Sequence, residues 1–257
     1  MPYNCFTALE LAAIASAFGA EKVYGLPDYF AGISQGEQNY LLQAATERLM
    51  EKQVLKMDFD GVVELAPDYR DIASVVFSCE KCLTVNLQDG RSGAKAFIFW
   101  KSTDRLVMAE AVENQYVLSF SDGDFLKALV SSFAYKDADE LPGSFVIPGI
   151  TLEKAKRACE EGRLDDAIRL IRQAGAHEKE AFMFAEALCC RADVLSVLLA
   201  DAQNGDAITE LTYFQTNRTL FRVGAKVVNL RSCAEIAGAD AESAKTSIEQ
   251  LVNSFLA

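Results

Sequence analysis

Two stretches of the chain alternate apolar and polar positions and are interrupted by turn residues at similar intervals. In the first stretch, four strands are predicted at roughly 82–88, 95–103, 105–113 and 116–121. In the second, four strands are predicted at roughly 194–202, 207–215, 218–223 and 226–231. The tight turns correspond, because Thr103-Asp104-Arg105 and Thr216-Asn217-Arg218 fall at the same place and Asp and Asn both accept turn geometry. Each stretch therefore predicts an antiparallel four-strand meander.

Each predicted meander is followed by an amphipathic helix with a similar end. The first closes on "LVSSF" at 129–133 and the second on "LVNSF" at 251–255. This predicts an α+β fold with two pseudo-twofold halves and meander repeats at 82–133 and 194–255. The second repeat carries an insertion around "CAEIAGADAES" before its last helix. Chance is the alternative, since strands and helices recur in any α+β protein.

The segments before the two meanders differ. A helix is predicted at Thr7–Ala20, with Thr7 as N-cap and Glu10 completing a capping box, and a second at about Gly36–Leu55. A turn, a short strand and a helix beginning near Pro67 follow, which gives an N-terminal winged-helix-like segment. In the second half, short links join helices at about 151–161, 164–174 and 178–191, which predicts a small helical bundle.

The halves are expected to form a single domain, 1–257, with subdomain boundaries of 1–140 and 141–257. The linker is "YKDADELPGSFVIPGI", whose "SFVIP" part is apolar enough to pack down or to face a partner. No cationic start precedes the first apolar run, and Glu10 interrupts it, so we expect a helix there rather than a signal peptide. No run is long enough for a transmembrane helix.

Composition narrows the classes of protein. Hydrophobic residues make up 51% of the 257, which allows a sizeable core. The net charge is −12, which disfavours binding to nucleic acids and to anionic membrane surfaces. The odd number of cysteines has no regular spacing, so we expect free thiols, no metal and a reducing cytoplasm. The cysteines are Cys5, Cys79, Cys82, Cys159, Cys189, Cys190 and Cys233.

No catalytic constellation is visible in the sequence. His177 is the only histidine, and it stands at a predicted helix start beside acidic residues. Cys79 and Cys82 in "CEKC" have the spacing of a zinc-binding pair, but the sequence has no second pair to complete a zinc site. The pair follows a predicted helix instead of beginning one, which argues against a thioredoxin-type redox site. Phosphate-binding, dinucleotide-binding and hydrolase motifs are absent. We therefore expect a protein that is not an enzyme and uses no cofactor.

The order of segments resembles the EspG family, the cytosolic chaperones of type VII secretion systems. The resemblance is carried by residues 6–30, by residues 47–76 and by the paired "FWKSTDRL" and "YFQTNRTL". It suggests a firmicute relative rather than a mycobacterial member. It implies an α+β protein with quasi-twofold halves, no cofactor and no catalysis. The implied partners are secreted helical-hairpin proteins of the WXG or LXG type, which the chaperone keeps soluble for export.

In that family the partner surface is formed by the C-terminal helical bundle and a sheet loop. The corresponding regions here are the helices within 151–191 and the loop Gln88–Ala94. The apolar residues of the predicted helix 178–191 are spread over more than one of its faces. A core needs only one face, so some of these residues are expected to be available to a partner. The candidate partner-binding residues are Phe182, Met183, Phe184, Leu188, Asp89, Arg91 and Phe145. Two other functions stay open: a non-catalytic scaffold or dimerisation protein, and a Cys-dependent enzyme, which the single histidine disfavours.

Overall fold

The computed structural model describes residues 4–20, 23–26, 29–89, 93–136, 142–189, 192–202 and 206–257. The strands of its main sheet are β1 (Cys5–Phe6), β4 (Lys81–Asp89), β5 (Gly93–Lys101), β6 (Leu106–Val112), β7 (Gln115–Ser121), β8 (Phe145–Pro148), β9 (Asp193–Asp201), β10 (Ala207–Gln215), β11 (Leu220–Val228) and β12 (Arg231–Gly238). The helices are α1 (Ala8–Phe18), α2 (Gln35–Glu51), α3 (Pro67–Ser78), α4 (Gly123–Ser131), α5 (Gly149–Glu160), α6 (Leu164–Gln173), α7 (Glu178–Cys189) and α8 (Ala241–Leu256).

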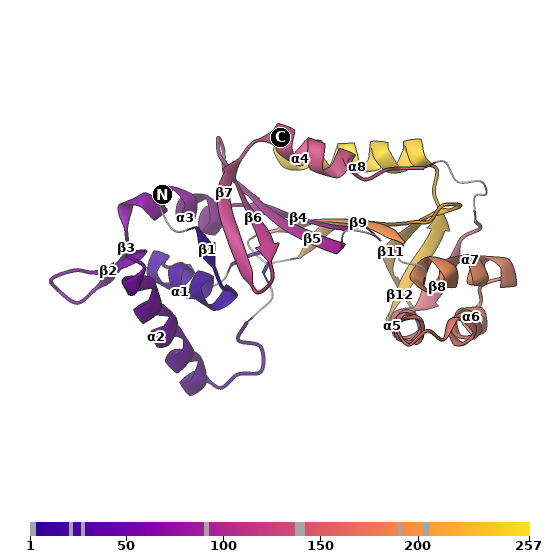
Figure 1. Ribbon diagram of the computed structural model, residues 1–257, viewed down its shortest axis with the longest axis horizontal. Helices are drawn as coiled ribbons and strands as arrows, with labels where there is room; N and C mark the ends of the chain where they lie inside the picture. The colour runs from indigo at the N-terminus through magenta and orange to yellow at the C-terminus, as the bar shows by residue number, and fades with distance from the viewer. Residues whose placement is uncertain are drawn as a thin grey trace.

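Within the described residues, ten strands form one antiparallel sheet in the order β1-β7-β6-β5-β4-β9-β10-β11-β12-β8. The helices α1–α3 lie at one end of this sheet and α5–α7 at the other, while α4 and α8 lie along one face of its centre (Figure 1). The predicted α+β class, with helices and antiparallel strands, is confirmed, and the strands of both halves belong to this one sheet. Both halves run in the same order: an edge strand, helices, a four-strand meander and a closing helix.

The two meanders meet at β4 and β9. These strands pair over eight positions, from Lys81 opposite Asp201 to Gln88 opposite Val194. Their buried side chains on one face join those of α4 and α8 in a single core, which includes Phe133 and Phe255. The residues that end "LVSSF" and "LVNSF" therefore share one hydrophobic cluster, because both closing helices cover the same face of the sheet.

The last two strands of the second meander differ from the prediction. Gly224 was expected in a turn, but it stays within β11, and the turn comes later at Asn229 and Leu230, whose φ angles are 50° and 61°. Both values lie in the left-handed region, which is typical of a two-residue hairpin turn. The supposed insertion "CAEIAG" belongs to β12. The prediction was wrong because glycine also occurs in extended strands, and its presence alone does not require a turn.

The N-terminal lobe follows the prediction more closely. Thr7 caps α1, and its side chain and that of Glu10 form the capping box. Pro67 begins α3, and a small hairpin of β2 (Leu55–Met57) and β3 (Val63–Leu65) precedes it. The helix α2 ends at Glu51, short of the predicted Leu55, because Leu55 pairs with Leu65 in that hairpin.

The bundle helices α5, α6 and α7 pack on the other end of the sheet. The apolar part of the linker forms β8, which pairs with β12, so it packs down against the sheet. The central anchor is Phe184 of α7, whose ring makes edge-to-face contacts with Phe145, Phe214 and Phe221 at centroid distances of 5.8, 6.2 and 5.3 Å. Such aromatic pairs stabilise the docking of the bundle on the sheet.

The prediction that every cysteine is free was wrong for one pair. Cys159 of α5 and Cys189 of α7 form a disulfide, with their Cα atoms 4.7 Å apart. Both helices turn a cysteine toward their shared interface, an arrangement that the spacing along the chain does not reveal. Cys5, Cys79, Cys82 and Cys233 are free, and Cys190 lies outside the described residues.

The first testable consequence concerns Glu10, which is 3% exposed and accepts a hydrogen bond from Lys52 at 2.5 Å while capping α1. Glu10→Ala removes a cap and a partly buried ion pair, so the free energy of unfolding should fall by about 2 kcal/mol. Glu37→Ala is the matched control, because Glu37 stands at the same position of α2 but is exposed. Urea denaturation measures both, and equal losses in the two variants would contradict the role of Glu10.

The second consequence concerns the disulfide between Cys159 and Cys189, which closes a loop with a sequence separation of 30. Cross-linking a loop of that length stabilises a protein by about 3 kcal/mol, because the unfolded chain loses conformational freedom. Oxidised protein should therefore resist urea better than reduced protein, and Cys159→Ser should remove the difference. Cys233→Ser is the control, since Cys233 is a free, buried thiol. Peptide mapping without reductant should recover the linked pair, and its absence would contradict the assignment.

Candidate partner-binding site

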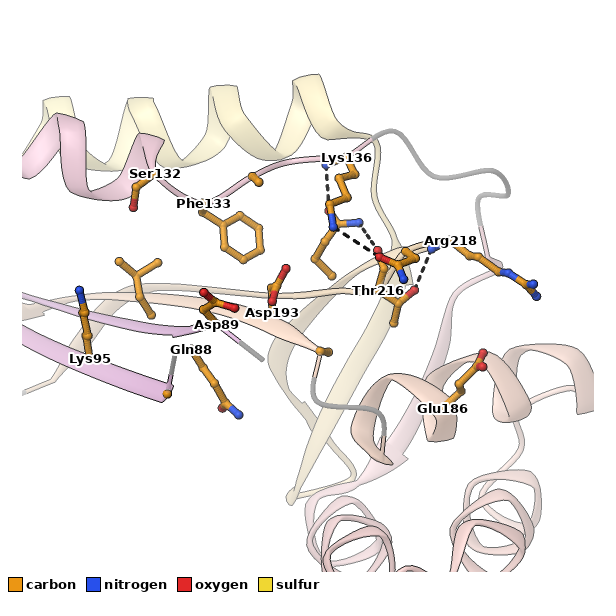
Figure 2. A pocket seen from close by; sticks show the side chains of 16 residues that line it. Gln88, Asp89, Lys95, Ser132, Phe133, Lys136, Glu186, Asp193, Thr216 and Arg218 are labelled. Carbon is orange, nitrogen blue, oxygen red and sulfur yellow. Dashed lines mark hydrogen bonds between the residues drawn. The ribbon is translucent and has the colours of Figure 1, made fainter. Parts of the chain in front are cut away.

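A hollow of about 800 Å³ lies where the two meanders, the segment after α4 and the helix α7 come together. Its walls are the ends of β4 and β10, the beginnings of β5 and β9, residues 132–134 with Lys136, and the turn 216–218 (Figure 2). Glu186 of α7 forms the side nearest the bundle. A hollow of this size is sufficient for a small protein segment or a small molecule.

Gln215 holds two walls of the hollow together. Its side chain is almost completely buried, and its amide nitrogen donates to the carbonyl oxygens of Thr216 at 2.8 Å and Thr219 at 3.3 Å. Its amide oxygen accepts a hydrogen bond from the backbone N–H of Lys136 at 3.1 Å. A buried amide with these partners fixes the segment after α4 against the β10–β11 turn.

The β10–β11 turn is held by its own threonine. The Thr216 hydroxyl oxygen accepts from the backbone N–H groups of Arg218 at 3.1 Å and Thr219 at 3.0 Å. Such a local bond from a hydroxyl oxygen stabilises a turn. The turn therefore presents Asn217 and Arg218 in a defined position at the edge of the hollow.

The lining carries both signs of charge around a small apolar floor. Lys95, Lys136 and Arg218 supply positive charge, and Asp89, Asp193 and Glu186 supply negative charge. The apolar side chains of the same lining are those of Leu87, Phe133, Ala134 and Ala192. The hollow thus offers charged groups of both signs beside a small apolar surface.

The structure divides the seven residues expected to contact a partner. Asp89 lies in the hollow and is exposed, and Phe182 of α7 is 48% exposed. Phe182 precedes Glu186 by four positions, so both lie on one face of the helix. The predicted sheet-loop and bundle regions thus meet at one surface, although their positions in the sequence are far apart.

Other candidates are less accessible. Met183 and Leu188 are half-buried against the bundle core. Phe184 and Phe145 are buried in that core, and we no longer propose them as partner contacts, because their rings anchor α7 and β8 to the sheet. Arg91 lies outside the described residues.

Several lining residues were missed by reasoning from the sequence. The sequence predicted only a turn at Thr216, Asn217 and Arg218. It gave no reason to select Gln215, Lys136 or Asp193 as site residues. The one indication in the sequence was the correspondence between the turns at "DRL" and "NRTL" in the two halves. Nothing in the sequence linked the second of them to α7 or to the segment after α4.

The other groups considered for chemistry lie elsewhere. Burial raises the pKa of the Cys79 thiol to about 12 and that of the Cys82 thiol to about 11, which keeps both protonated near neutral pH. His177 is exposed at the start of α7. Within the described ranges, no group of three or more His, Cys, Asp or Glu side chains is arranged to hold a metal ion. None of the helices in those ranges is both long and apolar enough to cross a membrane.

Comparison with known proteins shows a likeness in fold. No protein-family model and no curated protein matches the chain. Among solved structures, its fold is similar to that of the Mycobacterium tuberculosis type VII secretion system chaperone EspG5, determined in complex with the PE25-PPE41 dimer. The TM-score is 0.54 at 10% sequence identity, over 95% of this chain and 94% of that chain. The chain therefore has an EspG-like fold along nearly its whole length.

Proposed function

We propose that this protein is a cytosolic chaperone or adaptor that binds helical type VII secretion substrates and keeps them soluble for export. The observation that carries the proposal is the likeness to a secretion chaperone, which covers both halves and the bundle together. The proposed substrates are helical-hairpin proteins of the WXG or LXG type. That the chain comes from a firmicute stays a prediction.

The hollow and the adjoining face of α7 support this proposal as a docking surface. An exposed aromatic ring, Phe182, stands one helical turn from Glu186 at the rim of the hollow. An aromatic anchor beside charged groups is a common composition for the centre of a protein interface. The half-buried Met183 adds a flexible apolar side chain, which suits a surface that accepts several sequences. The net charge of −12 opposes self-association while such a surface is exposed.

Phe182→Glu should weaken substrate binding without unfolding the chain. The test is co-expression with each helical secretion protein encoded beside this gene, followed by size-exclusion chromatography. The wild-type chain is expected to co-elute with one of them at a dissociation constant of about 1 μM or better, and Phe182→Glu is expected to lose at least tenfold in affinity.

Phe120→Glu is the matched control, because Phe120 is 52% exposed on β7, toward the other end of the sheet. It should bind as the wild type does. If no neighbouring product co-elutes and deleting the gene leaves their export unchanged, the chaperone proposal fails. A complex that Phe182→Glu leaves intact would instead place the docking surface elsewhere.

We also propose that the chain is one domain, 1–257, made by duplication of one unit, with halves at 1–140 and 141–257. The shared order of elements supports this, as does the pairing of β1 with β7 and of β8 with β12 at matching edges. Val85 lies directly opposite Val197 in the middle of the central pair, where a twofold axis between the halves would pass.

The duplication predicts a specific superposition. A single rotation of about half a turn should bring residues 82–133 onto 194–255, with four strands and one helix overlapping and Phe133 near Phe255. The rotation angle and the matched Cα positions are the measurements. A best rotation far from a half turn would contradict the proposal.

A further inference from the structure

The sheet opens between β10 and β11. These strands pair over only four positions, from Thr212 opposite Val223 to Gln215 opposite Leu220. By contrast, β11 and β12 pair from Phe221 opposite Gly238 to Val228 opposite Arg231. Within the described part of the chain, no strand therefore pairs with residues 207–211 of β10 on their β11 side. Likewise, none pairs with residues 224–228 of β11 on their β10 side.

The backbone groups that face this opening follow from the hairpin. The turn at 229–230 has two residues, so Val228 and Arg231 form the hydrogen-bonded pair that closes it. Alternate residues of β11 before Val228 then bond to β12, and Ala225 and Val227 turn their N–H and C=O groups toward β10. The bond from the Ala239 N–H to the Leu220 carbonyl, at 2.9 Å, fits the same alternation.

The two faces of β11 differ in chemistry along the open edge. Val223 packs against the bundle core, and Val227, on the same face, is 75% exposed. Arg222 and Lys226 lie on the opposite face and are exposed. Lys226 donates to Glu235 at 2.6 Å, and Arg222 contributes with it to lowering the pKa of that carboxyl. The open edge thus has an apolar side and a mainly cationic side.

We propose that the β11 edge at Ala225 and Val227 is a strand-addition site for an extended peptide segment of a partner, in which apolar residues alternate with acidic ones. Backbone groups of the segment pair with the free N–H and C=O groups of these two residues. Its apolar side chains lie beside Val227, and its carboxylates face Arg222 and Lys226. This site is separate from the hollow beside α7 and does not depend on the proposed chaperone function.

A thin, extended occupant fits the opening better than the edge of a second copy of the chain does. The strands β10 and β11 meet again at Gln215 and Leu220, so the opening ends inside the sheet and admits a single segment. Antiparallel self-pairing centred on Lys226 would also place two lysines opposite each other, which is unfavourable. In the first half the equivalent strands β5 and β6 pair over six positions, from Ala96 opposite Ala111 to Lys101 opposite Leu106.

The test uses the full-length chain and a short fluorescent peptide in which valine and glutamate alternate. Fluorescence anisotropy should show saturable binding. Ala225→Pro removes one N–H that no strand among the described residues uses, and proline is tolerated at such an edge. Ala225→Pro should lower the affinity for the peptide at least tenfold and leave the melting temperature of the protein unchanged. Ala225→Val keeps the N–H and is the matched control, with binding like that of the wild type.

A peptide in which valine and lysine alternate tests the charge of the site. It should bind the wild type at least tenfold more weakly than the glutamate peptide, and Lys226→Glu should narrow that difference. If Ala225→Pro does not fold, amide exchange of residues 224–228 in the wild type replaces it, and the glutamate peptide should slow the exchange.

The proposal would be overturned by no binding of the glutamate peptide, by equal binding of Ala225→Pro and Ala225→Val, or by equal affinity of the wild type for both peptides. A wild-type dimer in light scattering that Ala225→Pro converts to monomer would also overturn it, since a second copy would then occupy the edge. In the amide-exchange version, exchange of residues 224–228 that the peptide leaves unchanged counts against the site.

Discussion

The antiparallel pairing of β4 with β9 joins the two halves of the molecule into one sheet. Val85 and Val197 lie opposite each other in its middle, and both are completely buried beneath the layer of α4 and α8. Each strand supplies apolar side chains to the same core, so neither half could bury its own face alone. Burial of apolar area is the main favourable contribution to folding, and here it requires both halves at once.

This pairing also creates the hollow beside the bundle. The strand β9 begins shortly after α7 ends, and antiparallel pairing places the beginning of β9 at the end of β4, with Val194 opposite Gln88. The β4–β5 end of the first half is thereby brought to the last turns of α7 in the second. Gln215 then fixes the remaining wall through its three hydrogen bonds. The candidate site is thus a consequence of sheet topology, with no residue motif of its own.

The halves share an order of elements but differ where surfaces are exposed. The first half adds the β2–β3 hairpin to its helices, while the second has a compact bundle anchored by Phe184 and joined by the disulfide between Cys159 and Cys189. The second half also has the longer hairpin, β11–β12, which separates from β10 and leaves an open edge. Open edges promote pairing with other chains, and this one lies next to the exposed side chains of Val227 and Leu230.

The element types, most strand positions and the cap of α1 could be predicted from the sequence, because periodicity, turn residues and the Thr7–Glu10 capping box act locally. The prediction failed at Gly224, whose local conformation is open to both a strand and a turn. Three features could not be predicted locally: the burial of Phe184 and Phe145 in the core, the disulfide between Cys159 and Cys189, and the position of Asp89 near α7. These facts depend on which elements pack together, and that was set by the pairing of distant strands and the shared burial of their apolar faces.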